Sequence, residues 1–199
     1  MASPSASSFF LLLLLPTILG MASAYSPVQI CVRPCPSEVN LHLYLHQFVA
    51  GPNHPNRNEE FLIAPANAFG FGTTLIHDWT LTRTTDPNDT LIARVQGTHI
   101  QAGTTNANSW YISQNIVFQS GRFAGSTLQV MGTLTENSVG QWSIVGGTGQ
   151  FTLAQGIINY KMDPSSNKDD AIRELNIRIL YDADDAQVAR DGALHLVQN

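Results

Sequence analysis

The sequence predicts an all-β protein whose strands pair in an antiparallel sheet. Three observations predict this fold class. Runs of β-branched and aromatic residues with short-period alternation follow one another along the chain. Residues typical of turns separate these runs. No long amphipathic helix is predicted before Tyr181, and the short connections favour antiparallel pairing because parallel strands need crossovers of roughly a dozen residues.

Eight runs form the elements of this fold. The segment TDPND separates the second run from the third, and DPSSN precedes the last one, as turn sequences do. Residues 50–60 are interpreted as a polar loop. Strands are predicted near residues 39–49, 70–81, 91–101, 109–119, 126–135, 141–146, 150–162 and 171–181.

Several of these runs are apolar on both faces. In the first run Leu41, Leu43 and Leu45 alternate with Tyr44 and Phe48. Closure of the sheet into a barrel fills its inner face with side chains, and oligomerisation can cover the outer face. We therefore expect a β-barrel.

The beginning of the chain has the features of a secretory signal peptide. Phe9–Leu15 is an unbroken apolar run, and Ala22-Ser23-Ala24 has the small-x-small form of a cleavage site. The run is shorter than the roughly 20 residues of a membrane span, so we expect a secreted protein with no membrane partner. The predicted order is a signal peptide (1–24), a Cys- and Pro-containing segment (25–38), the barrel (39–181) and a C-terminal tail (182–199).

Charge and cysteine content narrow the function further. The net charge is −5 and no basic patch is visible, so a nucleic-acid partner is not expected. Cys31 and Cys35 are the only cysteines, and a secreted context permits a disulfide between them. A metal site would need about four ligands, and no cluster of Cys or His supplies the others.

The glycine-rich stretch VGGTGQFTLAQG raises the question of a phosphate-binding loop. No Lys follows its glycines, and Thr152 stands where a dinucleotide-binding fingerprint needs a third glycine. The following residues alternate like a strand. We therefore interpret Gly146–Gly149 as a tight hairpin with positive φ angles between the sixth and seventh strands.

Two further polar features have simple interpretations. His42 and His46 would lie about 13 Å apart on a strand, at ~3.3 Å per residue, so one metal ion could not bridge them. We interpret both as polar positions on a strand face. Asn88-Asp89-Thr90 is an N-glycosylation sequon in a predicted turn, and glycosylation of Asn88 is expected in a secreted chain.

Asp78 is the candidate for acid–base chemistry. It lies near the end of an apolar run beside Trp79. If its side chain faces a closed interior, desolvation raises its pKa and lets it donate or accept a proton. If it faces outward, it is a strand-end residue, and the pattern leaves both possibilities open. Arg94 is ambiguous in the same way.

Five sequence blocks resemble plant dirigent proteins. In chain order they are LHLYLHQFVAGPN, FGFGTTLIHDWTLT, ARVQG, IVFQSGRFAGSTLQVMG and SIVGGTGQFTLAQG. The resemblance covers about residues 40–181, and it is the combination of blocks that is specific.

The resemblance implies an eight-stranded antiparallel β-barrel with a central pocket, related to allene oxide cyclase. It implies a homo-oligomer, a dimer or trimer, that is secreted to the apoplast and needs no cofactor. It also implies that the pocket binds phenoxy radicals from a separate oxidase, a laccase or peroxidase. Such a pocket steers radical coupling to one stereoisomer, as when coniferyl alcohol gives lignans. Some relatives instead dehydrate or cyclise a phenolic substrate, and a pocket acid can assist closure of a quinone methide.

The family's pocket residues carry over only in part. Asp78 matches the second of two family acids and is the catalytic candidate, whereas His77 replaces the first. Gln47 replaces another acid, Leu134 falls near a third acid, and Gln155 stands at a family arginine. The candidate substrate-binding residues are Gln47, Arg94, Leu134 and Gln155.

These departures leave alternatives to stereoselective coupling. A noncatalytic phenolic-binding or wall-associated defence barrel is the second hypothesis, because acids and an arginine are lost. An allene-oxide-cyclase-like enzyme acting on an oxidised fatty acid is a third hypothesis, supported only by analogy of fold.

Overall fold

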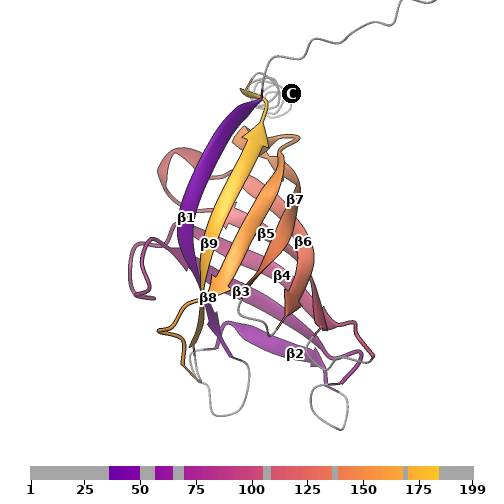
Figure 1. Ribbon diagram of the computed structural model, residues 1–199. Helices are drawn as coiled ribbons and strands as arrows, with labels where there is room; N and C mark the ends of the chain where they lie inside the picture. The colour runs from indigo at the N-terminus through magenta and orange to yellow at the C-terminus, as the bar shows by residue number, and fades with distance from the viewer. Residues whose placement is uncertain are drawn as a thin grey trace, which may run out of the picture. The chain divides into compact units, whose positions relative to one another are not determined.

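The computed structural model describes residues 36–49, 57–64, 70–104, 109–135, 139–167 and 170–183. Strands account for most of these residues, and two 3-10 helices join some of them (Figure 1). The elements are β1 (Ser37–Phe48), β2 (Glu59–Ile63), β3 (Thr74–Thr82), β4 (Ala93–Gln101), β5 (Ser109–Phe118), η1 (Gly121–Phe123), β6 (Thr127–Thr135), β7 (Val139–Thr148), η2 (Gly149–Phe151), β8 (Gln155–Met162) and β9 (Asp170–Tyr181).

The strands form one antiparallel sheet that closes on itself. From β3 to β9 each strand pairs with the next one along the chain, and β1 pairs with β9 over its whole length. β1 also pairs with β3 through Tyr44, Leu45 and His46, which completes an eight-stranded barrel (Figure 1). The predicted all-β antiparallel barrel is confirmed.

All eight predicted strands are present, and most of their ends agree within about two residues. The second and seventh start later than predicted, at Thr74 and Gln155. A turn precedes β3, in which Gly72 has a φ of 91°, and η2 precedes β8. Because both turns contain apolar residues, the sequence pattern predicts that these two strands begin earlier than they do.

β2 is a strand that the sequence did not predict. It pairs with β3 over Thr74–His77, so β1 and β2 occupy successive parts of the same edge of β3. The interpretation of residues 50–60 as a loop is therefore wrong for Glu59 and Glu60. The segment EEFLI lacks an alternating pattern, and its three apolar side chains are exposed, so only its partner strand marks it as β.

The glycine-rich stretch is not the tight hairpin that the sequence predicted. Gly146 and Gly147 lie within β7 near a β-bulge, and only Gly149 of the four residues has a positive φ, 65°. The chain then turns through η2, and Leu153 also takes a positive φ of 57°. A Cβ on Gly147 would lie 2.7 Å from the Cβ of Phe151, so this glycine serves close packing instead of a turn.

One end of the barrel interior is apolar. η1 and η2 follow the ends of β5 and β7, and they place Phe123 and Phe151 against Phe118. The ring centroids of Phe123 and Phe151 lie 4.7 Å apart. These aromatic side chains fill the interior where β5 and β7 end, and the polar side chains of the interior lie toward the other end of the barrel.

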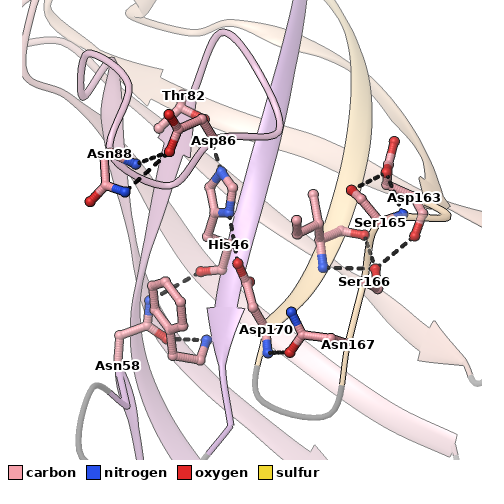
Figure 2. A network of polar contacts seen from close by, with 12 residues as sticks. His46, Asn58, Thr82, Asp86, Asn88, Asp163, Ser165, Ser166, Asn167 and Asp170 are labelled. Atoms are coloured by element: carbon pink, nitrogen blue, oxygen red, sulfur yellow. Dashed lines mark hydrogen bonds and ion pairs between the residues drawn. The ribbon is translucent and has the colours of Figure 1, made fainter.

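A buried histidine connects β1, β3 and β9 at the closure seam, the place where β1 pairs with β3 and the barrel closes. His46 is fully buried between β1, β3 and β9, and Figure 2 shows its ring between Thr82 and Asp170. Its Nδ1 lies 3.3 Å from Asp170 Oδ2, and its Nε2 lies 2.9 Å from Thr82 Oγ1. Asn58 adds a hydrogen bond from its Nδ2 to the His46 carbonyl, at 3.0 Å. These contacts connect strands that are distant in sequence.

Candidate functional site

Polar side chains gather inside the barrel at the end where β1 finishes. They occupy interior positions that alternate with outward ones, as His77 does between Leu75 and Trp79 on β3. All of them are buried except Gln47, which is half-buried. We call this set the interior polar cluster: Gln47, Glu59, His77, His99, Gln114 and Arg173.

Glu59 is the acid of this cluster, and β2 positions it. Its Oε2 accepts hydrogen bonds from Gln47 Nε2 at 3.0 Å and from Trp79 Nε1 at 3.2 Å. Arg173 Nη1 donates to Gln47 Oε1 at 2.6 Å. Gln47 therefore bridges a buried cation and a buried anion, each of which would be costly in the interior without a partner.

Two histidines face each other beside this acid. His77 Nδ1 and His99 Nδ1 lie 3.1 Å apart, so one must donate and the other accept. His77 Nε2 also lies 3.0 Å from Gln114 Oε1. This last contact spans from β3 to β5 across β4, over Gly97, where a Cβ would lie 2.6 Å from the Cα of Gln114. A glycine at this position therefore leaves room for the contact.

Burial sets the protonation of the cluster. Desolvation lowers the pKa of His77 to about 4, although its hydrogen bond with Gln114 opposes the change. Desolvation lowers the pKa of His99 to about 3, helped by the charges of His77 and Arg173. Desolvation also lowers the pKa of Arg173 to about 10, against the effect of Tyr160 and Glu59. At neutral pH both imidazoles are neutral and the guanidinium is charged.

Flat aromatic surfaces border the cluster. The rings of His77 and Trp79 are stacked with centroids 3.7 Å apart, and Trp110 meets His99 edge-on at 5.3 Å. Two buried polar atoms nearby, Gln101 Oε1 and Gln114 Nε2, have no hydrogen-bond partner among the described residues. The region thus combines apolar ring surface with hydrogen-bonding capacity that the protein does not use itself.

One distance in the cluster has a chemical consequence. His99 Nε2 and Glu59 Oε2 lie 3.8 Å apart, which is too far for a direct hydrogen bond. A hydroxyl oxygen about 2.8 Å from each atom would contact both, but its single proton can be donated to only one of them. With His99 Nε2 unprotonated, the arrangement therefore offers a hydroxyl group two alternative acceptors, the imidazole and the carboxylate.

Comparison with known sequences shows the family of this chain. The model of the family described as Dirigent-like protein matches residues 38–180. The chain belongs to the dirigent family. It is 28% identical over 190 residues to pterocarpan synthase 1 of Glycyrrhiza echinata, which covers 88% of this chain and 97% of that protein. It is also 33% identical over 159 residues to dirigent protein 1 of Arabidopsis thaliana, which covers 76% of this chain and 86% of that protein.

Solved structures agree with this assignment. The structure of a pterocarpan synthase dirigent protein superposes with a TM-score of 0.67 at 26% identity, covering 75% of this chain and 99% of the other. The predicted resemblance to dirigent proteins is therefore confirmed by sequence and by fold.

The structure places the acid proposed for this dirigent protein, Asp78, outside the barrel. On β3 the interior positions are those of Leu75, His77, Trp79 and Leu81, so Asp78 points outward with its side chain 41% exposed. Both of its oxygens accept hydrogen bonds from Arg94, which is outward for the same reason. The possibility that Asp78 and Arg94 face the interior is wrong, because strand alternation turns both away from it.

The other candidate binding residues do not converge. Gln47 belongs to the interior polar cluster, and Leu134 is buried in the interior face of β6. Gln155 is exposed on the outer face, where it lines a surface groove beside Arg178. Of the predicted binding residues, Gln47 alone lies within the cluster.

The remaining predicted sites are surface features or lie outside the described residues. Asn88 is exposed in a turn, and its backbone N–H and side-chain amide both donate to Asp86 Oδ1 (Figure 2). Its glycosylation stays a prediction. Cys31 and Cys35 lie outside the described residues, as do the predicted signal peptide and most of the tail. Among described residues, no helix is long and apolar enough to cross a membrane, and no cluster of His, Cys, Asp and Glu is arranged to hold a metal ion.

Sequence reasoning missed most of the interior polar cluster. Five of its members had a usable signal, because they share strand parity with buried apolar residues such as Leu45, Trp79 and Ile112: Gln47, His77, His99, Gln114 and Arg173. Glu59 had no such signal, because its inward orientation depends on β2, which only the pairing with β3 defines.

Proposed function

We propose that this dirigent protein binds a phenolic intermediate at the interior polar cluster and directs one stereochemical course of its reaction. The observation that carries the proposal is the 3.8 Å gap between His99 Nε2 and Glu59 Oε2, beside aromatic walls. A phenol has the matching chemistry, since its ring can pack on apolar surface while its hydroxyl hydrogen-bonds at one point. The pterocarpan synthases that this chain resembles support a phenolic substrate class.

The histidine pair defines which atom receives the phenolic proton. If His77 Nε2 donates to Gln114 Oε1, His77 Nδ1 is an acceptor and His99 Nδ1 must donate to it. His99 Nε2 is then an unprotonated acceptor that faces Glu59. A phenolic O–H can donate its one proton to this nitrogen. The adjacent Glu59 carboxylate then stabilises the partial positive charge that develops on the imidazole ring of His99.

This geometry suits closure of a quinone methide by a phenolic hydroxyl. In that step a carbon–oxygen bond forms as the exocyclic C=C π bond of the quinone methide breaks, the attacking hydroxyl loses its proton, and the quinone-methide carbonyl oxygen takes up a proton from water, so the net reaction is an isomerisation. His99 Nε2 accepts the departing proton in our proposal, and the fixed cluster presents one face of the electrophile. No oxidation is involved, so no redox partner is needed for this step.

Coupling of phenoxy radicals, which the resemblance to dirigent proteins implies, is a second form of this proposal. A separate laccase or peroxidase would oxidise monolignols such as coniferyl alcohol, and the barrel would orient two radicals so that one pair of faces meets. This proposal includes secretion to the apoplast and assembly of barrels into a homo-oligomer. The mixed apolar and polar outer face, with exposed Ile76, Tyr111 and Met131, is consistent with such assembly.

The test compares stereochemical outcomes with and without the protein. One arm supplies an oxidase with coniferyl alcohol, and the other supplies a phenolic quinone-methide precursor that can close a ring. We expect an enantiomeric excess in at least one arm, lost in Glu59→Gln and in His99→Gln. Asp78→Asn is the matched control, because that carboxylate lies outside the barrel, and it should retain the excess. Racemic products from every phenol in both arms would reject the proposal.

A noncatalytic binding barrel is the second candidate function. Gln47 stands at a family acid, and its amide is used to bridge Arg173 and Glu59. If the protein only binds phenols, titration calorimetry will show saturable binding that weakens in His99→Gln, while the products remain racemic in both arms.

A further inference from the structure

An opening lies in the barrel wall, away from the interior polar cluster. β3 pairs with β1 only through Tyr44, Leu45 and His46, and it ends at Thr82. The part of β1 before Tyr44 therefore has β9 on one side and no strand on the other among the described residues. A cleft of about 400 Å³ occupies this place between β1 and η1.

The inner side of the cleft is apolar. Leu43, Phe118 and Phe123 are buried core residues that reach its surface, and Leu41 and Ile92 are half-buried beside them. A ligand with an apolar body would remove this surface from water, at roughly 25 cal/mol for each Å² buried.

The rim of the cleft is cationic. Arg83 and Arg122 are both exposed lining residues, and no acidic residue is among the lining set. No ion pair joins either arginine to a carboxylate of the described residues. Hydrogen bonds from Thr90 N and Thr84 Oγ1 lower the pKa of the Asp89 carboxyl, and the nearby charge of Arg83 adds to this effect without a direct ion pair. Arg122 has its guanidinium over the Phe123 ring, 4.4 Å from the centroid. The chain as a whole carries a net charge of −5, so this local positive charge is not a general property of the surface.

We propose that this cleft binds an amphipathic carboxylate, an organic acid with one anionic head and an apolar body. The two guanidinium groups offer planar paired donors that match a carboxylate, and the edge of β1 adds backbone N–H groups that no strand of the described residues uses. The apolar inner side distinguishes the ligand from an inorganic anion, which would leave that surface in contact with water. The site is separate from the interior polar cluster and does not depend on the proposed function.

Arylpropenoic acids and medium-chain fatty acids share this chemistry. The experiment is titration calorimetry of the purified protein with 4-hydroxycinnamate and with decanoate. Each acid is paired with its neutral alcohol, 4-hydroxycinnamyl alcohol or decanol. We expect saturable binding of at least one acid, binding at least tenfold weaker for its alcohol, and affinity that falls as salt rises. Preference for the aromatic acid or the fatty acid identifies the source of the ligand.

Variants assign the binding to the cleft. The double variant Arg83→Gln/Arg122→Gln changes two exposed side chains and should weaken binding of the acid at least tenfold without lowering the unfolding midpoint. Lys161→Gln removes an exposed cation elsewhere, on β8, and should leave the affinity unchanged. Glu59→Gln should also leave it unchanged. Absence of saturable binding for both acids, equal binding in the arginine double variant, or loss of binding in Glu59→Gln would each overturn the proposal.

Discussion

The Nδ1 atoms of His77 and His99 lie 3.1 Å apart inside the barrel. Two neutral imidazoles can make this contact only as opposite tautomers, and two protonated ones cannot make it at all. Burial lowers the pKa of His77 to about 4 and that of His99 to about 3, so the contact is stable at neutral pH. The pair therefore couples the stability of this dirigent barrel to pH.

We expect the free energy of unfolding to decrease as the pH falls from about 6.5 to about 4. In the unfolded chain both histidines take up a proton near pH 6.5, whereas in the folded chain His77 and His99 stay neutral until lower pH. The unfolded state then binds more protons, so each histidine costs up to about 1.4 kcal/mol of stability per pH unit in this range. Urea unfolding at several pH values measures the slope.

Single variants separate this effect from other titrating groups. His77→Gln and His99→Gln should each flatten the dependence of unfolding free energy on pH between about 6.5 and 4. His42→Gln is the matched control, because His42 is exposed on the outer face of β1, and its profile should run parallel to that of the wild type. Identical slopes in all four proteins would contradict our account of the pair.

The contact between His77 and Gln114 should depend on the glycine beneath it. A Cβ at Gly97 would lie 2.6 Å from both Cα and Cβ of Gln114, so Gly97→Ala forces β5 or the side chains above it to move. We expect a loss of roughly 1–3 kcal/mol in unfolding free energy, typical of an overpacked core. Gly70→Ala has open space around the new methyl group and is the control. A Gly97→Ala protein as stable as the control would show that β4 tolerates a side chain there.

The strands were predictable from the sequence because alternation is a local signal. In a run such as the one that contains Leu75, Trp79 and Leu81, neighbouring residues are enough to show the alternation. All eight strands predicted from such runs are present. The way in which the barrel closes was harder to predict from the sequence. It depends on the register between Leu45 and Leu81, two positions far apart in the chain, and on the short strand β2 that completes the edge.

The site was predictable only where a polar residue interrupts an apolar series. His77 shares the parity of Trp79, and the same parity turns Asp78 outward, so alternation alone favoured the histidine over the acid. The family resemblance pointed instead to the retained acid. Glu59 was not accessible to either argument, since its segment carries no alternation and its inward orientation depends on pairing with β3.

The closure seam should be sensitive to the loss of one side chain. His46 is fully buried and contacts both Asp170 and Thr82 (Figure 2). His46→Leu would leave the Asp170 carboxylate buried without this partner, which we expect to cost about 1–3 kcal/mol of unfolding free energy. His42→Leu alters an exposed position on the same face of β1 and should change stability by only about 0.5 kcal/mol or less. Equal stability of the two variants, measured by urea unfolding, would show that the seam does not depend on these contacts.

The outer ion pair of Asp78 and Arg94 should contribute little to stability and nothing to stereochemistry. The two side chains are 41% and 38% exposed, and ion pairs that contact water to this extent contribute about 1 kcal/mol or less. Asp78→Ala should therefore lower the unfolding free energy only slightly, and the double variant with Arg94→Ala should be no less stable than the sum of the single changes predicts. The enantiomeric excess of the products should be the same in the wild type and in both variants. A strong loss of enantiomeric excess in Asp78→Ala, with the unfolding midpoint retained, would show that chemistry takes place on the outer face of β3 and would remove the interior polar cluster from its proposed role.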